Sequence, residues 1–426
     1  MSDDKTNKNF VTAVEDAKET LRGQFKPTPL WHNAFLSERY GCDIYLKRED
    51  TTPVRSYKIR GAFNFFERQI RRHGTGDSKP AFACASAGNH AQGFAYACAA
   101  FGCQGTIFMP VTTPQQKIQK TKAFGRDFVT IRLVGDIFDE ALAAAIDHCD
   151  QSGSVMVPPF DHEDIITGQA TVALEVLDQL DNKQPDLVIM PVGGGGLSAG
   201  MTRYLSEKSP DTGFLFVEPE GAPSLRTSLE EGRQVTLGKV DNFVDGAAVA
   251  RIGDAPFKQL SRFSSDQVML IPEDRLCNTM EEFLNIEGIV LEPAGALAID
   301  ALRELDYGAL KGKTIVCVVS GGNFDFERLP EVKERALKYA SLKKYFILRM
   351  PQRPGALKDF LFLLGPDDDI TRFEYLKKSA RNFGSILIGI QTNAPENFKI
   401  LTRKFEESGI QYQDITENEI ISNLIV

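Results

Sequence analysis

The chain has no long apolar run. None of its hydrophobic stretches approaches the about 18 consecutive apolar residues that a membrane-spanning helix requires. The segment from Met1 to Phe10 is polar and charged, so it has no apolar centre or cleavage site of a secretion signal. We therefore expect a soluble protein of the cytoplasm, and the sequence leaves the matrix of an organelle open as the alternative.

Patterns for metal ions and disulfides are also missing. The five histidines form no H-E-x-x-H motif, and the seven cysteines form no C-x-x-C motif, so no metal site is expected. An odd number of cysteines in a long chain argues against a disulfide framework. The closest pair, Cys98 and Cys103, stands in an apolar, alanine-rich stretch. We expect buried free thiols.

Positive charge is in deficit. The chain has 49 lysines and arginines against 58 acidic residues, which gives a net charge of −9. Nucleic acids and anionic membranes both require a basic face on the protein that binds them. Neither is expected as a partner, although net charge says little about a small substrate.

The chain is too long for one hydrophobic core. Its 426 residues exceed the about 250–300 that a single core usually reaches, so at least two domains are expected. From residue 40 to residue 325, short apolar runs alternate with helical stretches, which predicts an α/β fold with a parallel sheet between helices. The predicted strands are Asp43–Leu46, Ala81–Cys84, Thr106–Met109, Phe128–Leu133, Leu187–Val192, Phe214–Val217 and Thr314–Val319, and two predicted helices are Ile59–Arg72 and Ala91–Phe101.

The pattern changes near residue 330. Pro330–Lys344 is charged and is predicted to be a connecting helix. The remaining elements have the order β-α-β-β-α-β over about 85 residues, which is typical of a ferredoxin-like α+β domain. They are Tyr345–Met350, Ala356–Leu364, Ile370–Leu376, Ser385–Thr392, Glu396–Ser408 and Ile410–Ile415. We predict a first domain over residues 1–329, a linker over 330–342 and a second domain over 343–426.

Lys58 lies in the segment Arg55–Ala62, at the predicted start of a helix. Most lysines in such a place are surface residues, and the segment alone decides nothing. The positive end of a helix, together with burial, disfavours the protonated amine and lowers its pKa towards reactivity. Lys58 is therefore a candidate reactive amine.

The segment Ser86-Ala87-Gly88-Asn89-His90 directly follows a predicted strand. A glycine in such a turn lets backbone N–H groups point at a ligand, and the helix N-terminus favours an anion such as a carboxylate. An ordinary capped turn explains the same residues equally well.

Four consecutive glycines, Gly193 to Gly196, stand between a predicted strand and a predicted helix. A plain turn needs one or two glycines, whereas a strand, a glycine loop and a helix form a phosphate cradle. Gly194, Gly196 and Ala199 also fit the dinucleotide pattern G-x-G-x-x-A, and Glu218 follows about 20 residues later. The glycines therefore indicate a phosphate site and leave an NAD enzyme open.

Ser320-Gly321-Gly322-Asn323 follows the very apolar predicted strand Thr314–Val319. The segment is either a plain turn, or it places the Ser320 hydroxyl group at the carboxyl edge of the sheet for a ligand. Ligands bind at that edge in open α/β folds.

Taken together, the four segments resemble the fold-type II pyridoxal-phosphate enzymes, which have two α/β subdomains with parallel sheets. The resemblance covers about residues 20–328 and is closest to the threonine dehydratases, also called threonine deaminases. The residues that carry it are Lys47-Arg48-Glu49-Asp50, Ser56–Ala62, the tetraglycine with Leu197, and Glu292-Pro293-Ala294-Gly295-Ala296. The G-T-G-G and S-x-K-D-R patterns of cysteine synthases are absent from these places.

The resemblance implies roles for particular residues. Lys58 would hold pyridoxal phosphate as a Schiff base and act as the general base. The phosphate would lie on the N–H groups of Gly193, Gly194, Gly195, Gly196 and Leu197. Asn89 would hydrogen-bond the ring 3′-oxygen and Ser320 the ring nitrogen. The substrate would be held by Ser86, Gly88, Asn89 and His90.

The implied reaction is the deamination of L-threonine to 2-oxobutanoate and ammonia, in the biosynthesis of isoleucine. L-Serine would react by the same path. Glu218-Pro219-Glu220 also resembles the start of a cation site in serine racemases, but Ser224 lacks the carboxylate of a third ligand, which favours a structural role for Glu218.

The segment Arg349–Leu357 resembles the opening strand, turn and helix of the ACT-like regulatory domain of biosynthetic threonine deaminases. In that family the domain binds isoleucine, so L-isoleucine is the implied effector. The chain has room for one such unit, and pairing of units between the subunits of a homotetramer is implied. A domain that serves only assembly is the alternative.

Other functions stay open at this point. Within the same cofactor class these are a catabolic serine/threonine dehydratase and a serine racemase. An NAD-dependent dehydrogenase gives no task to Lys58 or to Ser320–Asn323. A non-catalytic amino-acid sensor would be expected to have lost Lys58 or the glycine loop, and both are present.

Overall fold

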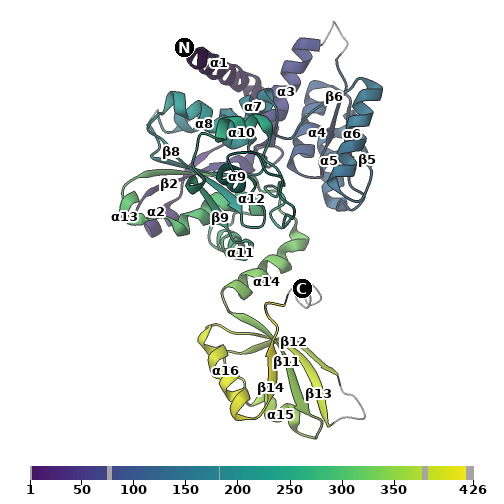
Figure 1. Ribbon diagram of the computed structural model, residues 1–426, viewed down its shortest axis with the longest axis vertical. Helices are drawn as coiled ribbons and strands as arrows, with labels where there is room; N and C mark the ends of the chain where they lie inside the picture. The colour runs from purple at the N-terminus through teal and green to yellow at the C-terminus, as the bar shows by residue number, and fades with distance from the viewer. Residues whose placement is uncertain (1, 74–78, 182, 377–381, 419–426) are drawn as a thin grey trace. The chain divides into compact units, whose positions relative to one another are not determined.

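The computed structural model describes residues 2–73, 79–181, 183–376 and 382–418 (Figure 1). The chain forms two compact units. The first contains the residues up to Glu273 and the segment Ile289–Phe324, and the second contains Asp274–Gly288 and the residues from Asp325 on. Each unit has a hydrophobic core of its own. None of the helices in the described part of the chain is long and apolar enough to cross a membrane.

The first unit contains a six-stranded sheet in the order β1-β2-β10-β7-β8-β9. All neighbouring strands are parallel except β1, which pairs antiparallel with β2. The strands are β1 (Leu30–His32), β2 (Asp43–Arg48), β7 (Leu187–Pro191), β8 (Gly213–Pro219), β9 (Val268–Ile271) and β10 (Thr314–Val319). Because β7 and β10 are parallel neighbours, the tetraglycine and Ser320 follow them at the same edge of the sheet.

The first unit also contains a four-stranded parallel sheet in the order β5-β4-β3-β6. Its strands are β3 (Phe82–Ala85), β4 (Gly105–Met109), β5 (Val129–Leu133) and β6 (Val155–Met156). Separate clusters of buried side chains lie on its two faces, a large one that includes α4 and a small one that includes α6. The segment Ser86–His90 connects the end of β3 to the start of α4.

Helices pack around both sheets (Figure 1). The longer ones in the first unit are α1 (Ser2–Arg22), α3 (Lys58–His73), α4 (Asn89–Phe101), α5 (Gln115–Gly125), α6 (Phe138–Ser152), α7 (Glu163–Gln179), α8 (Gly196–Lys208) and α12 (Pro293–Asp300). The shorter ones are α2 (Ala34–Tyr40), α9 (Ser224–Glu230), α10 (Asp254–Leu260) and α13 (Tyr307–Leu310).

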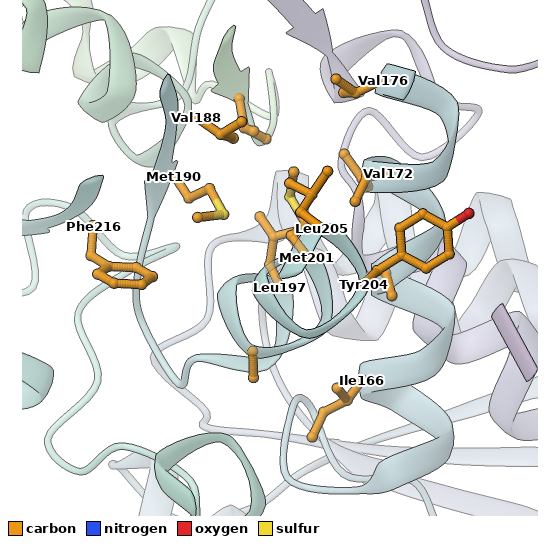
Figure 2. Packing of buried hydrophobic residues seen from close by; sticks show 14 of the residues in the cluster. Ile166, Val172, Val176, Val188, Met190, Leu197, Met201, Tyr204, Leu205 and Phe216 are labelled. Carbon is orange, nitrogen blue, oxygen red and sulfur yellow. The ribbon is translucent and has the colours of Figure 1, made fainter. Parts of the chain in front are cut away.

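A large cluster of buried side chains in the first unit fixes the helix that follows the glycine loop. Leu197, Met201 and Leu205 are spaced four residues apart, so they lie on one face of α8. Figure 2 shows these three side chains between β7 and α7, and all three are buried. Burying three large aliphatic side chains contributes roughly 5–8 kcal/mol before the entropy of ordering them is subtracted. The start of α8 is therefore held firmly at the end of β7.

The second unit contains a four-stranded antiparallel sheet in the order β12-β13-β11-β14. Its elements are α11 (Glu273–Glu282), α14 (Leu329–Tyr339), β11 (Lys343–Pro351), α15 (Ala356–Leu361), β12 (Asp369–Leu376), β13 (Phe383–Gln391), α16 (Glu396–Glu407) and β14 (Gln411–Asp414). Alternate residues of β11 and β13 form its core with α15 and α16. Strand order and helix positions are those of the predicted ferredoxin-like fold.

The parallel sheets and the antiparallel C-terminal sheet confirm the predicted fold class. The predicted connecting helix Pro330–Lys344 was too long, because α14 ends at Tyr339, Ser341 has a left-handed backbone (φ 54°) and β11 begins at Lys343. The sequence did not predict α1, β1, β6 or β9. All seven cysteines are free, and all except Cys149 are buried.

Candidate active site

Lys58 is the first residue of α3, at the positive end of the helix. Its Nζ donates a hydrogen bond of 3.0 Å to the Pro159 carbonyl and lies 5.7 Å from the centre of the Phe160 ring. Burial lowers the pKa of the Lys58 amine to about 8, although the Glu292 carboxylate acts in the opposite direction. An amine with this pKa is partly neutral near neutral pH and can act as a nucleophile or a base.

A buried cluster of charges holds α3 in place. Arg60, which is fully buried, forms ion pairs of 2.7 Å with Glu49 and with Glu175. Lys47 adds a second cation 2.7 Å from Glu175, so two buried cations face two buried carboxylates. The cluster joins the end of β2 to α3 and α7, and it fixes the turn of helix that carries Lys58.

The tetraglycine forms the turn between β7 and α8, and α8 begins at Gly196. Gly195 has φ 85°, a left-handed conformation that glycine adopts without strain. A Cβ atom on Gly194 would overlap the ring of Phe160, so the aromatic ring packs directly on this turn. The side chain of Leu197 lies in the core, and therefore only its backbone N–H remains for a ligand. A helix N-terminus with an open glycine backbone suits a phosphate group.

The segment Ser86–His90 lies at the start of α4, where Ser86 Oγ accepts a hydrogen bond of 3.2 Å from the Gly88 N–H. The His90 ring is buried, with Nε2 2.9 Å from the Val157 carbonyl. Burial and the nearby Lys58 amine lower the pKa of His90 to about 3, so the ring is neutral. The ring is thus held by the Val157 carbonyl, and the backbone N–H of His90 lies in the first turn of α4.

Ser320 is buried at the end of β10, and its carbonyl accepts a hydrogen bond of 3.1 Å from the Tyr57 N–H. Ser56 and Gly321 form a β-bridge beside it. The loop that ends in Lys58 is therefore attached to the segment that begins with Ser320. The pairing brings two motifs that are far apart in the chain side by side.

Four residues that the sequence did not assign to the site connect its parts. Pro159 and Phe160 link Lys58 to the glycine loop. The carboxylate of Glu292 accepts hydrogen bonds from the Asn89 side chain and from the Asn323 backbone N–H. Glu292 and Asn323 were quoted only as parts of sequence motifs, and no local pattern singles out Pro159 or Phe160.

These groups fit pyridoxal phosphate. The group needs an amine that can be neutral, a cradle of N–H donors for its phosphate, and polar partners for its ring. Lys58 supplies the amine, the glycine loop supplies backbone N–H groups, and Asn89 is hydrogen-bonded to Asn323, three residues after Ser320. A Cβ atom on Gly194 would overlap the Phe160 ring, and a Cβ atom on Gly193 would lie only 3.0 Å from Ala247 Cα.

Glu218 has a structural contact. Its carboxylate accepts hydrogen bonds from Ser224 Oγ and from the N–H groups of Leu225 and Arg226, so it caps α9. Burial raises the pKa of Glu218 to about 7, and these hydrogen bonds oppose the rise. Both carboxylate oxygens thus have partners within the protein, which supports the structural role.

Two family models match the chain. Residues 21–321 match the family of pyridoxal-phosphate dependent enzymes, and residues 334–425 match the C-terminal regulatory domain of threonine dehydratase. The first match spans both parallel sheets and every predicted residue of the site. The match argues against the alternative of an NAD-dependent dehydrogenase, because the glycine loop lies within the segment that matches the pyridoxal-phosphate enzymes.

Known relatives agree with both matches. The chain is 44% identical to the biosynthetic L-threonine dehydratase of Halalkalibacterium halodurans over 97% of this chain and 99% of the relative. The corresponding protein of Bacillus subtilis is also 44% identical, over 98% of this chain and 97% of the relative. The processed threonine deaminase isoform 2 of Solanum lycopersicum has a similar structure, with a TM-score of 0.71 and 36% identity over 78% of this chain and 94% of that one. The chain belongs to the biosynthetic threonine dehydratases, a family of pyridoxal-phosphate-dependent enzymes.

Proposed function

We propose that the protein deaminates L-threonine to 2-oxobutanoate and ammonia, the reaction that starts isoleucine biosynthesis. The observation that carries this proposal is the Lys58 amine, which has a lowered pKa and contacts the residues beside the glycine loop. Nearly full-length identity to biosynthetic L-threonine dehydratases supports the choice of substrate.

Bound pyridoxal phosphate supplies an electron sink for the α-carbon of the amino acid. The residues of the chain bind and move protons around it. The glycine loop Gly193–Leu197 would hold the phosphate through backbone N–H groups, and the Asn89 amide would donate to the ring oxygen. The Lys58 amine would hold the group covalently and would serve as the general base for the α-proton.

Ser320 would be the partner of the ring nitrogen and would set the strength of this electron sink. A serine hydroxyl facing the ring nitrogen, unlike a carboxylate, leaves that nitrogen largely unprotonated. The weaker sink suits loss of the β-hydroxyl as water better than reactions that need a long-lived carbanion.

The substrate carboxylate is held by Ser86, Gly88, Asn89 and His90. The start of α4 provides N–H groups and the positive end of a 13-residue helix. Threonine and serine differ by one methyl group, which gives only about 1–3 kcal/mol of discrimination. Measurable serine turnover is therefore expected beside threonine turnover.

Residues 1–329 form the catalytic domain in this proposal, 330–342 the linker and 343–426 the regulatory domain. L-Isoleucine is the proposed effector of the regulatory domain. A cavity of about 410 Å³ is lined by residues of α15 and the sheet. Met350, Leu361 and Ile386 offer apolar surface and Lys358 offers positive charge, whereas the Arg353 guanidinium is paired with Asp359. An aliphatic amino acid has the complementary groups. A domain that serves only assembly remains the alternative.

The proposed location of the protein is the cytoplasm, and its proposed assembly is a homotetramer. Light scattering of the purified protein during size-exclusion chromatography measures the assembly directly. A monomer would contradict it.

The test of function is an absorbance scan of the purified protein, followed by detection of 2-oxo acid after addition of threonine. A band near the ~410–430 nm expected of a lysine-bound pyridoxal group, with 2-oxobutanoate formed, supports the proposal. Comparison with serine gives the substrate ratio, and a colourless protein that stays inactive with added pyridoxal phosphate contradicts the cofactor. Added isoleucine that leaves the rate unchanged contradicts the effector alone.

A further inference from the structure

Glu292 is a buried carboxylate on which two hydrogen-bond donors converge. It precedes α12 and is 4% exposed. Oε1 accepts a hydrogen bond of 2.7 Å from Asn89 Nδ2, and Oε2 accepts one of 3.2 Å from the Asn323 backbone N–H. A carboxylate offers a separate acceptor oxygen to each donor, whereas a glutamine side chain has one oxygen and an NH₂ group in place of the other.

The hydrogen bonds fix which end of the Asn89 amide faces which neighbour. Asn89 Oδ1 accepts a hydrogen bond of 2.7 Å from Asn323 Nδ2, and the same Nδ2 group also donates to the Val54 carbonyl at 2.8 Å. An ionised carboxylate can only accept, so the NH₂ end of Asn89 must point towards Glu292. One N–H of that group is used, and the second is left for a ligand.

The carboxylate has little room to move. Glycines stand on two sides of it, and a Cβ atom on Gly321 would overlap Glu292 Oε1. A Cβ atom on Gly246 would lie 3.4 Å from the same oxygen and 3.9 Å from Asn89 Nδ2. Close packing of this kind holds the pair of side chains in one arrangement.

Charged and titratable groups surround Glu292. Burial and the nearby Asp245 raise its pKa to about 7, whereas the two hydrogen bonds and Lys117 oppose the rise. Tyr57, Lys58 and Lys120 also interact with its charge. Asn323 Oδ1 accepts a hydrogen bond from the Lys120 ammonium group, so a cation contacts the side chain that donates to Asn89.

We propose that Glu292 is a positioning residue that acts through Asn89. It holds the Asn89 amide so that an N–H group, and not the carbonyl oxygen, faces the ring oxygen of pyridoxal phosphate. This inference rests on the role of Asn89 in the proposed function. Glu292 makes no contact with the cofactor in this scheme, and its effect is on the donor that Asn89 presents.

The test uses Glu292→Gln in the holoenzyme, with two readouts besides activity. The first is the dissociation constant for pyridoxal phosphate, and the second is the band near ~410–430 nm of the lysine-bound group. The glutamine NH₂ group would face a donor and turn or displace Asn89. Because a hydrogen bond to a charged group is worth about as much as a tenfold change in binding, we expect about tenfold weaker cofactor binding and a weaker band.

Glu218→Gln is the matched control. Glu218 is also fully buried, has the same raised pKa and accepts hydrogen bonds from neighbouring donors, but its partners lie in α9. Loss of cofactor binding and of the band in Glu292→Gln, with both retained in Glu218→Gln, supports the inference. Equal changes in the two variants would show a general effect of losing a buried carboxylate and would overturn it.

A double variant tests whether Glu292 acts through Asn89. In an Asn89→Ala background, Glu292→Gln should add no further loss of cofactor affinity, since its target is gone. Additive losses overturn the inference. If Glu292→Gln does not fold, Asn323→Ala is the second test, because it removes the donor to Asn89 Oδ1 that also fixes the orientation of the Asn89 amide. An unchanged band and an unchanged cofactor affinity in that variant overturn the inference as well.

The pH dependence of the band gives an independent readout. Protonation of Glu292 removes one of its two acceptors, so the wild-type band should weaken as the pH falls through about 7, and the variant should lose this step. Asn89→Ala with wild-type affinity and band contradicts the proposed role of Asn89 itself. A changed Asn89→Ala beside an unchanged Glu292→Gln contradicts only the role of Glu292.

Discussion

The Nζ atom of Lys58 donates a hydrogen bond of 3.0 Å to the backbone carbonyl of Pro159, 101 positions further along the chain. The bond directs the amine towards Phe160, whose ring packs on the glycine loop. Lys58, the helix start and the proposed phosphate cradle are thus joined through one short segment. This geometry motivates the first two predictions.

Lys58→Ala should remove both the activity and the band of the lysine-bound cofactor. Loss of a general base alone lowers turnover by at least about 10²-fold, and loss of the covalent attachment removes the band. Absorbance and 2-oxobutanoate formation are the measurements. Lys313→Ala, at a half-exposed lysine paired with Asp186, serves as the control and should keep both. Retained turnover in Lys58→Ala would contradict the assignment of this lysine.

Pyridoxal phosphate should attach to the cofactor-free protein at a rate that depends on pH. The pKa of the Lys58 amine should set this dependence. Burial lowers that pKa from 10.5 to about 8. Only the neutral amine attacks, so the rate should rise about tenfold for each pH unit below 8 and level off above it. Stopped-flow absorbance gives the profile. A rate that continues to rise to pH 10 would show an ordinary lysine amine.

Much of the fold follows from local patterns. The apolar runs of β7 and β10 and the helix periodicity of α3 are signals within single segments, and each element lies within two residues of its prediction. In α1, Phe10, Val14, Ala17 and Leu21 are buried at helical spacing. This spacing is a local signal too, but a search for apolar runs overlooks it because polar residues stand between them.

The missing parts of the site have a different cause. Glu292 and Asn89 are 203 positions apart, and their contact exists only after the two α/β sheets have come together. Phe160 follows two prolines in an irregular segment, where no periodicity indicates what its ring covers. Strands such as β1 and β6 have three and two residues, too few to form a pattern. Tertiary contacts decide these features, and a single sequence does not encode them locally.

Glu175→Gln should destabilise the first unit strongly. The variant leaves Arg60 and Lys47 with one buried carboxylate in place of two, and an uncompensated buried charge costs about 3–5 kcal/mol. Urea unfolding measures the change. Glu230→Gln breaks the half-exposed pair with Arg226, which is worth at most about 1 kcal/mol, and it is the control. Equal midpoints for the two variants would contradict a stabilising role for the buried cluster.

The same cluster predicts how stability depends on pH. Burial alone would raise the pKa of Glu175, but Arg60 and Lys47 outweigh it and lower the pKa from 4.5 to about 2. A lowered pKa of a carboxylate stabilises the folded state above the ordinary value, and that contribution is lost as the pH falls from 4.5 through about 2. The free energy of unfolding should therefore fall over this window, and it should fall less steeply in Glu175→Gln. Parallel curves would contradict the prediction.

Gly194→Ala should weaken cofactor binding because the added Cβ would overlap the Phe160 ring and force the loop or the ring to move. Overpacking of this kind typically costs about 1–3 kcal/mol, equivalent to roughly a 5- to 150-fold loss of affinity if it falls on the cradle. Gly23→Ala is the matched control, since a Cβ there meets no atom within 4 Å. The sharper measurement is the double variant Gly194→Ala with Phe160→Ala. Removing the ring makes room for the new methyl group, so the dissociation constant for pyridoxal phosphate should return towards that of Phe160→Ala alone. Losses that simply add would show that the glycine is required for a reason other than contact with Phe160.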